Sequence, residues 1–358
     1  MGKIKKYLFI IIAITFTSCL KDEQVKLPYN GYEPKPDKGD WEISSPQAED
    51  MDAEALNQAY QLLYDNDRFV MARSLLIFRN GKLVAEAYPH DVTDIDNINN
   101  IQSCTKAVTS ILTGIGIKNR LVGSLDEKFY SVYPELFDTD TSKRDICWRD
   151  ALTMQTGLNF DNSEHTLELY RTSMNSAAYV LSLKRLYKSG LVMSYNDGAP
   201  QLVAKALEKK CGKQLSQFAR EQLFSKLDIT NWKWETAKDE TNFGAFSLYL
   251  RPRDLGKIGQ LLLQNGYWNG EQLIDSIYLK EATSSLVCAN NNNEPFGYYF
   301  WILPAWNAYY ALGHGGQFVL VVPDKQLVVV YTACPYISDK LYDVKNLLIT
   351  YILESCNQ

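Results

Sequence analysis

The chain has 358 residues, of which 46% are hydrophobic and 22% are charged. This composition excludes a disordered, collagen-like or fibrous protein and supplies enough apolar residues for a sizeable core. The formal charge of −5 excludes long-range attraction to nucleic acid, and three histidines are few for a histidine-based metal site.

The amino terminus has the pattern of a targeting signal. Lys3, Lys5 and Lys6 precede an apolar run at 7–16 that is too short to span a bilayer. The following residues, Phe16-Thr17-Ser18-Cys19, resemble a bacterial lipobox, in which the cysteine is lipidated and becomes the new terminus. We therefore predict a lipoprotein signal peptide at 1–18 and lipidation of Cys19. The alternative is an ordinary secretory signal with an incidental cysteine.

The next residues extend this prediction to a location. The sequence Cys19-Leu20-Lys21-Asp22-Glu23 resembles the acidic signal that sends some Gram-negative lipoproteins to the outer face of the outer membrane. Acyl chains on Cys19 would hold the protein at the membrane without a spanning helix. Residues 19–45, with three prolines among Lys, Asp and Gly, predict a lipidated tether. We expect an exported lipoprotein of the cell envelope, at the outer membrane and exposed on the surface.

The mature chain begins and ends with patterns that predict one sheet and its covering helices. Residues 52–65 have helical spacing, and apolar runs at 74–78 and 83–88 flank Asn80-Gly81, a strong hairpin signal. Further strands are predicted at 298–303, 308–312, 318–322 and 327–332, and a last helix at 339–355.

The middle of the chain is predicted to be mainly helical. Apolar residues recur at helical spacing over 105–117, 165–187, 200–210, 215–227 and 253–265. Strands joined by tight turns must be antiparallel. We therefore predict an α+β domain over 46–358, in which 46–102 and 286–358 build one antiparallel sheet flanked by terminal helices, and 103–285 is a helical insertion. The six cysteines after Cys19 are scattered, without a C-x-x-C pair, which predicts mostly buried free thiols.

One candidate for chemistry is the S-x-x-K motif formed by Ser103 and Lys106. Residues three apart on a helix share a face, and unpaired N–H groups at a helix start favour an oxyanion. The same positive helix end, together with burial, disfavours the ammonium form of Lys106, so the amine is predicted to be a neutral base that activates the Ser103 hydroxyl. The alternative is a helix cap beside a solvated lysine. Cys104 points about 100° away on the helix and is not expected to act as a nucleophile.

Two further motifs follow in chain order, Ser194-Tyr195-Asn196-Asp197-Gly198 and Gly313-His314-Gly315-Gly316-Gln317. With S-x-x-K they resemble the penicillin-recognising serine hydrolases, a β-lactamase-related family. The family pattern is S-x-x-K, then Y-x-N, then K-T-G or H-x-G. The closest pattern is that of class C β-lactamase-like esterases and 6-aminohexanoate-dimer hydrolases, and softer similarity at 148–158, 250–259 and 296–298 extends the resemblance over about 40–355.

This resemblance implies a β-lactamase/transpeptidase-like fold and acyl transfer through a serine ester. Ser103 would be the nucleophile, and Lys106 and Tyr195 would handle the proton. The sequence leaves open which of these two residues is the base. The backbone N–H groups of Ser103 and Gln317 would form the oxyanion hole. Gly315 and Gly316 would let a ligand approach the strand edge. Neither a metal nor an organic cofactor is implied.

The chain departs from the family pattern at two positions. Asp197 stands where Y-x-N has an asparagine, and an ionised carboxylate only accepts hydrogen bonds. We therefore expect Asp197 to alter the recognition of a substrate amide or carbonyl, with a helix N-cap as the alternative. His314 replaces the K-T-G lysine and would not hold a substrate carboxylate as an ammonium does; its alternative is support of the loop.

Three functions remain open on the sequence. The first is a membrane-anchored serine hydrolase that cleaves an amide or ester of a small or oligomeric substrate. The second is a DD-peptidase or β-lactamase that acts on peptidoglycan or β-lactams, and the third is a non-catalytic lipoprotein sensor on the same scaffold. Loops at 160–175 and 286–296, which contain Asn290–Asn293, are expected to form the substrate walls.

Overall fold

The computed structural model describes residues 25–36, 39–137, 140–289, 293–334 and 344–356. The predicted signal peptide, Cys19, the start of the tether, Asn290–Asn292 and residues 339–343 of the predicted last helix lie outside these ranges.

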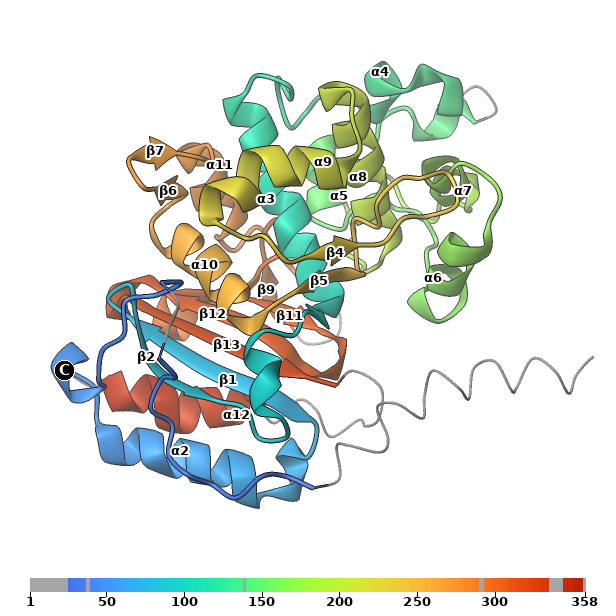
Figure 1. Ribbon diagram of the computed structural model, residues 1–358. Helices are drawn as coiled ribbons and strands as arrows, with labels where there is room; N and C mark the ends of the chain where they lie inside the picture. Colours follow the sequence, from blue (N-terminus) through green and yellow to red (C-terminus); the bar gives the residue numbers. More distant parts are fainter. Residues whose placement is uncertain (1–24, 37–38, 138–139, 290–292, 335–343, 357–358) are drawn as a thin grey trace, which may run out of the picture.

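An antiparallel sheet of eight strands is the centre of the fold, in the order β2-β1-β13-β12-β11-β10-β9-β8 (Figure 1). Its strands come from both ends of the chain, as predicted. They are β1 Ala72–Arg79, β2 Lys82–Ala87, β8 Val287–Cys288, β9 Pro295–Phe296, β10 Trp301–Leu303, β11 Ala308–Gly313, β12 Gln317–Val322 and β13 Leu327–Ala333.

The β1–β2 hairpin turns at Asn80 and Gly81, with φ of 52° and 78°. Positive φ at both central residues is the turn geometry that suits the twist of paired strands, which explains why Asn-Gly occurs here. The predicted strand at 298–303 is shorter than expected, because Tyr299 has φ of 68° and the ladder starts only at Trp301. The two-residue strands β8 and β9 were not predicted.

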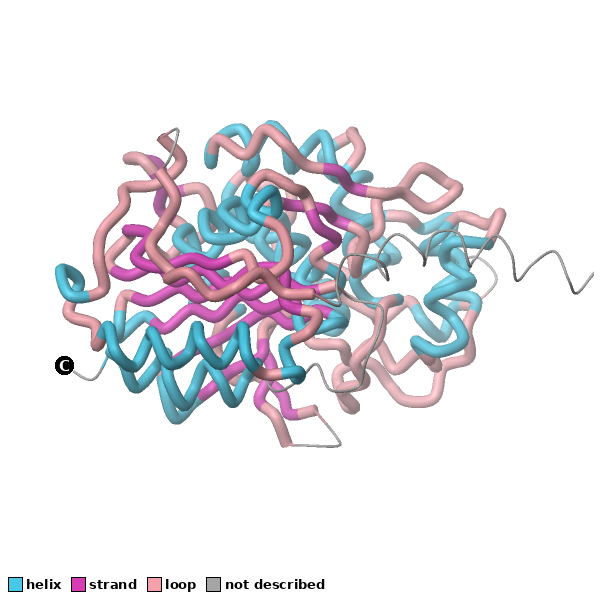
Figure 2. The backbone as a smooth tube through the Cα atoms, turned by 60° about the horizontal axis from the view of Figure 1, so that its bottom comes forward, coloured by secondary structure: helices cyan, strands magenta, loops and turns pink. Residues whose placement is uncertain are grey.

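Helices from both ends of the chain cover one face of the sheet, as predicted. Helix α2 (Ala53–Asp65) starts at Asp52, whose carboxylate accepts from the N–H groups of Glu54 and Ala55. Leu56, Tyr60 and Leu63 of α2 are fully buried. The carboxyl-terminal segment continues from α12 (Val344–Leu347) into a π-helix, Leu348–Leu353, and packs with α2 over the same core. Figure 2 shows this helical layer beneath the strands.

The opposite face of the sheet carries α10 and α3. Gly256 and Gly259 of α10 lie directly against Phe78 and Val328 of the sheet, where a Cβ would overlap these side chains. The inserted block also holds most of the remaining helices. Its α-helices are α3 Thr105–Lys118, α4 Phe129–Val132, α5 Trp148–Leu152, α6 Asn162–Arg171, α7 Ser176–Ser182, α8 Gly198–Cys211, α9 Leu215–Ala219, α10 Pro252–Leu263 and α11 Ser276–Ala282, and a π-helix, Arg220–Phe224, continues α9.

Three features in and next to this block differ from the prediction. The stretch at 165–187 is two helices, α6 and α7, because Asn175 caps a new helix by accepting from the N–H groups of Ala177 and Ala178. A three-stranded sheet was also missed. It pairs β3 (Asn99–Asn100) with β5 (Leu248–Leu250), and β5 with β4 (Lys233–Trp234). A two-stranded hairpin, β6 (Tyr267–Trp268) with β7 (Glu271–Gln272), completes the block.

The described part of the predicted tether packs against the domain. The N–H of Leu27 donates to the carbonyl of Pro89, and the N–H of Glu86 donates to the carbonyl of Tyr32. The Tyr32 ring stacks on Tyr60 with centroids 5.1 Å apart. The N–H of Ser44 donates to the carbonyl of Leu83, so 39–45 also contacts the domain. The described residues of 25–45 therefore pack on the domain, and the lipidated tether stays a prediction.

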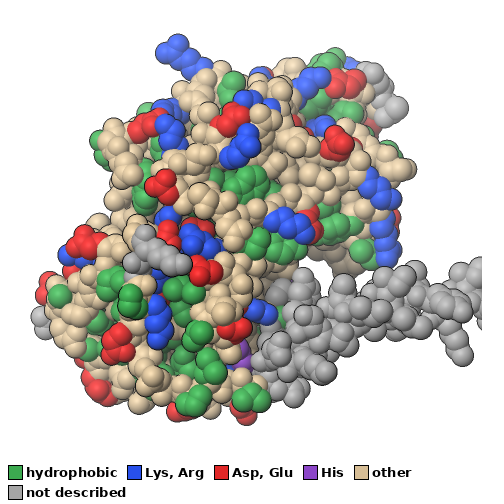
Figure 3. Space-filling model, viewed as in Figure 1, with side chains coloured by type: hydrophobic (Ala, Val, Ile, Leu, Met, Phe, Trp, Pro, Cys, Tyr) green, Lys and Arg blue, Asp and Glu red, His purple; other side chains and the backbone are tan. Residues whose placement is uncertain are grey.

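The charged side chains and the cysteines are distributed as in an ordinary globular domain. Acidic and basic side chains are interspersed on the face in Figure 3. Within the described ranges, no helix has both the length and the apolarity to cross a membrane. The six cysteines after Cys19 are all free thiols; Cys104, Cys147, Cys334 and Cys356 are buried, which confirms the prediction.

Candidate active site

Ser103 lies in the turn that starts α3. A 3-10 turn, Gln102–Cys104, leads directly into the helix, and Gln102 has φ of 50°. The side-chain oxygen of Asn100 accepts from the Gln102 N–H at 2.9 Å and supports this unusual conformation. The backbone before it is held to the neighbouring sheet, since the Ile101 N–H donates to the Leu248 carbonyl. The serine is thus presented at a helix start, as predicted.

Lys106 follows on the same face of the helix and reaches Ser103. Its Nζ donates to the Ser103 Oγ at 2.9 Å, to the Asp197 Oδ1 at 2.7 Å and to the Ala245 carbonyl at 3.2 Å. Only 2% of the lysine side chain is exposed. The spacing argument for a Ser103–Lys106 pair is therefore confirmed, and the alternative of a solvated lysine is wrong.

The charge state expected for Lys106 is not supported. Burial lowers the pKa of the amine, as the sequence argument assumed, but attraction to Asp197 and Tyr195 and their hydrogen bonds outweigh burial and raise the pKa above its ordinary value. Lys106 is therefore an ammonium at neutral pH in the resting site.

Asp197 is the carboxylate that raises the pKa of Lys106. It occupies the N-cap position of α8, but its carboxylate makes no capping hydrogen bond, which corrects the N-cap alternative. Asn196 performs that function by accepting from the Ala199 N–H at 2.7 Å. The second carboxylate oxygen, Oδ2, accepts from the Thr166 hydroxyl at 2.6 Å, and the Asp197 N–H donates to the Asn162 side-chain oxygen at 2.9 Å.

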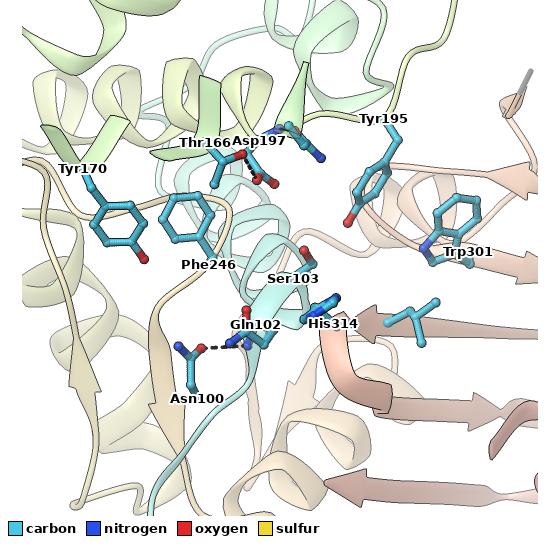
Figure 4. Close-up of a pocket in the computed structure, with 13 residues that line it drawn as sticks. Asn100, Gln102, Ser103, Thr166, Tyr170, Tyr195, Asp197, Phe246, Trp301 and His314 are labelled. Carbon is cyan, nitrogen blue, oxygen red and sulfur yellow. Dashed lines mark hydrogen bonds between the residues drawn. The ribbon is translucent and has the colours of Figure 1, made fainter. Parts of the chain in front are cut away.

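Tyr195 lies in the loop just before α8, beside the same lysine. The Lys106 Nζ is 4.9 Å from the centre of the Tyr195 ring. The ring stacks against Trp301 of β10, with centroids 5.6 Å apart. Figure 4 shows the Tyr195 hydroxyl directed toward Ser103. The structure thus brings Ser103, Lys106 and Tyr195 together.

The glycine-rich motif forms the tight turn between β11 and β12. Gly315 and Gly316 have φ of 84° and 92°, which glycine adopts without steric cost. The end of β11 touches the chain before the nucleophile: a Cβ on Gly313 would lie 2.5 Å from the Ile101 carbonyl oxygen. Gly313 is thus required by packing within the chain, and the ligand approach expected at Gly315 and Gly316 stays a prediction.

Gln317 starts β12 next to the nucleophile turn. Its carbonyl is 3.5 Å from the Cys104 Sγ, and its side-chain amide bonds the backbone of Ala333 in both directions. Burial raises the pKa of the Cys104 thiol, which suits a packing role. His314 is exposed at the rim of the site.

Ser103, Tyr195, Asp197 and His314 open onto one cavity of about 640 Å³ (Figure 4). Tyr195 and Trp301 form one wall. The opposite wall contains Phe246 and Tyr170, whose rings stack with centroids 5.2 Å apart. Ser103 lies between the two aromatic walls, so a substrate group on either side of the reacting carbonyl meets an aromatic surface.

Helix α6 supplies wall residues that sequence motifs did not identify. Asn162, Thr166 and Tyr170 line the cavity, which agrees with the expectation that 160–175 is a substrate wall. They are spaced by four, so they share one helix face, and that spacing was the available signal. The cavity lining contains no described residue of 286–296. Within the described ranges, no group of three or more His, Cys, Asp or Glu side chains is arranged to hold a metal ion.

Comparison with known proteins agrees with the geometry. Residues 70–336 match the family model described as Beta-lactamase. A structure from Bacillus anthracis, described as a candidate 6-aminohexanoate-dimer hydrolase, is 18% identical with a TM-score of 0.73, over 94% of this chain and 88% of that one.

Two other solved structures share the fold. A candidate beta-lactamase from Bacteroides dorei is 15% identical with a TM-score of 0.70, over 86% of this chain and 100% of that one. A class C beta-lactamase from Rhodobacter sphaeroides is 13% identical with a TM-score of 0.65, over 84% of this chain and 100% of that one. The comparison with curated proteins finds no match.

Proposed function

Because the chain belongs to the beta-lactamase family, whose members are serine hydrolases, we propose that it cleaves an amide or ester bond through an acyl-serine intermediate on Ser103. The observation that carries this proposal is the 2.9 Å contact between the Lys106 Nζ and the Ser103 Oγ at a solvent-accessible cavity. A serine hydroxyl needs such a neighbour to become a nucleophile.

In the proposed first step, the Ser103 Oγ bonds to the substrate carbonyl carbon while its proton passes to the Lys106–Tyr195 pair. Because Lys106 is an ammonium, we propose that Tyr195 accepts this proton as its phenolate, which the adjacent ammonium stabilises, and its oxygen is directed to the serine. The carbonyl oxygen becomes an oxyanion, for which the N–H groups of Ser103 and Gln317 are the proposed donors. One such donor stabilises the transition state by about 2.7–4 kcal/mol.

In the second step, the bond to the leaving group breaks and the same proton is returned to the departing amine or alkoxide. Water then attacks the acyl-serine ester and releases the acid, with the proton moving through the same pair in the reverse sense. Every proton in this cycle is handled by side chains of the chain itself, so the proposed reaction needs no further reactant than water.

The substrate class follows from the walls of the cavity. Lys106 is already paired with Asp197, and His314 replaces the lysine that would hold a substrate carboxylate. Aromatic rings on both sides of Ser103 suit apolar groups. We therefore propose a neutral amide or ester of a small or oligomeric compound, rather than a β-lactam or a carboxylate-terminated peptide.

A further part of the proposal concerns location. The pattern around Cys19 supports a lipid anchor in the cell envelope, at the outer membrane and with the enzyme domain exposed. Metabolic labelling with a palmitate analogue tests it, because Cys19→Ala would lose the label and the membrane fraction.

The central experiment compares wild type with Ser103→Ala on a panel of p-nitrophenyl esters and short linear amides. Ser131→Ala is the matched control, since Ser131 is exposed and away from the cavity. Loss of hydrolysis in Ser103→Ala alone supports the proposal, and equal activity refutes it.

Two probes separate the other functions. A stable adduct of fluorescent penicillin on Ser103 would favour a DD-peptidase. Hydrolysis of penicillin with release of the product would favour a β-lactamase. A fluorophosphonate that never modifies the folded protein would favour a non-catalytic sensor.

A further inference from the structure

The carboxylate of Asp197 is held between two elements that are distant in sequence. Its Oδ1 lies 2.7 Å from the Lys106 Nζ on α3, and its Oδ2 lies 2.6 Å from the Thr166 hydroxyl on α6. Its backbone N–H is fixed by Asn162, also on α6. Each carboxylate oxygen thus has a donor from the protein, and the side chain is only 10% exposed.

The position of this carboxylate determines the charge on the lysine. Three oxygen atoms surround the Lys106 Nζ, and two of them, the Asp197 Oδ1 and the Ala245 carbonyl oxygen, only accept hydrogen bonds. The third, the Ser103 Oγ, can accept or donate. Without a negative charge nearby, burial would favour a neutral amine that accepts from the serine; with the carboxylate, the ammonium is favoured.

We propose that Asp197 is a positioning residue that keeps Lys106 protonated and thereby sets the pH range of the reaction, and that Thr166 holds Asp197 in place. The inference rests on the proposed function. It assigns to Asp197 a role toward Lys106 instead of the substrate recognition expected from its place in the motif, and it gives α6 a part in the chemistry.

The other described groups near Lys106 do not replace the negative charge of the Asp197 carboxylate. Tyr195 faces it from the loop before α8, and the Cys104 thiol lies on the same turn with a raised pKa, so it stays neutral. His314, on the rim between β11 and β12, is exposed to solvent. Asp197 is therefore the carboxylate that acts on Lys106 among the described residues.

Loss of the Asp197 charge shifts the acidic limb of the pH–rate profile in the same direction whether Lys106 or Tyr195 is the base. If Lys106 is the base, removing the carboxylate lowers its pKa and increases the neutral fraction. If Tyr195 is the base, loss of the nearby negative charge likewise makes it easier to remove one proton from the Lys106–Tyr195 pair, whichever of the two groups carries the remaining proton. In both cases the acidic limb of the rate profile moves to lower pH when Asp197 loses its charge.

The test is the pH dependence of kcat/KM for Asp197→Asn, which keeps the shape of the side chain and removes the charge. Hydrolysis of p-nitrophenyl butyrate is followed at the isosbestic wavelength of nitrophenol. An opposite charge at this distance shifts a pKa by about 1–3 units, so the acidic limb is expected to move down by about 1–3 pH units. An acidic limb at the same pH as in the wild type within experimental error, or at higher pH, overturns the inference.

Thr166 provides a second variant that leaves both charges in the site. Thr166→Val removes the donor to Oδ2 and is expected to lower kcat several-fold with little change in KM, and Thr166→Ser is expected to restore kcat. Wild-type kcat in Thr166→Val, or no rescue by serine, overturns the assigned role of Thr166.

Ser103→Ala separates this inference from the function on which it rests. If that variant keeps full activity, the proposed function fails. If Ser103→Ala is inactive and Asp197→Asn has the wild-type pH profile, only the role of Asp197 fails.

Discussion

The free energy of the Lys106–Asp197 ion pair can be predicted from its geometry. The charged atoms are 2.7 Å apart, and the two side chains are 2% and 10% exposed. At an effective dielectric constant of about 20, unit charges at this distance attract by about 6 kcal/mol, but desolvation costs several kcal/mol for each ion. The intact pair therefore adds little net stability, while the loss of one partner leaves a costly buried charge.

Lys106→Met removes the ammonium and keeps most of the apolar volume. The unpaired carboxylate of Asp197 can avoid burying its charge by taking up a proton. An aspartic acid ordinarily titrates near about 3.9, so neutralising it costs about 4 kcal/mol at pH 7 and about 1.5 kcal/mol at pH 5. We expect the variant to lose about 3–4 kcal/mol of unfolding free energy at pH 7, and clearly less at pH 5, because the penalty falls as the pH approaches the ordinary pKa.

Urea unfolding followed by tryptophan fluorescence and circular dichroism measures both values. The matched control is the double variant Lys106→Met/Asp197→Asn, in which no buried charge remains, and it is expected to regain most of the loss. The reasoning is refuted if Lys106→Met costs the same at pH 7 and pH 5, or if the double variant loses the sum of the two single variants.

Three further predictions concern the walls and thiols of the site. Phe246→Leu removes the ring that stacks on Tyr170, so it should raise KM for an ester with an aromatic acyl group by about 2–10-fold and leave kcat nearly unchanged. A variant KM equal to that of the wild type in steady-state kinetics would contradict this. Gly313→Ala should lower the unfolding free energy by about 1–3 kcal/mol and reduce kcat, since its Cβ would lie 2.5 Å from a backbone carbonyl; a wild-type melting temperature would exclude that clash. Iodoacetamide at pH 8 should alkylate Cys288, which is exposed, and leave Cys104 unmodified in the folded protein, as read by peptide mass spectrometry; rapid labelling of Cys104 would show that its thiol is accessible.

The central sheet could be predicted because its signals are local. Asn80-Gly81 specifies its turn through two positive φ angles, and the alternation of runs at β11, β12 and β13 leads to antiparallel pairing of neighbours in sequence. The small sheet of β3, β5 and β4 could not be predicted in the same way. Its strands have two or three residues, and β3 pairs with a partner about 150 positions away, so nothing near Asn99 in the sequence indicates the pairing.

The site was predictable to the extent that its residues occur in motifs. Ser103 and Lys106 share a helix face by spacing alone, and the structure joins them at 2.9 Å. Thr166 carries no motif, and its hydrogen bond to Asp197 depends on the packing of α6 against the start of α8. The regular spacing of the α6 residues indicates a common face, but only the three-dimensional fold shows that this face points to the nucleophile.

The charge on Lys106 shows why a motif alone is insufficient for the chemistry. Burial and the helix start both favour a neutral amine, and these are the two effects that the S-x-x-K motif indicates. A carboxylate at 2.7 Å reverses the outcome, and the Asp197 side chain is available to Lys106 while Asn196 accepts from the start of α8. The protonation state of the site therefore depends on a contact between α3 and the start of α8, residues that are far apart in the sequence.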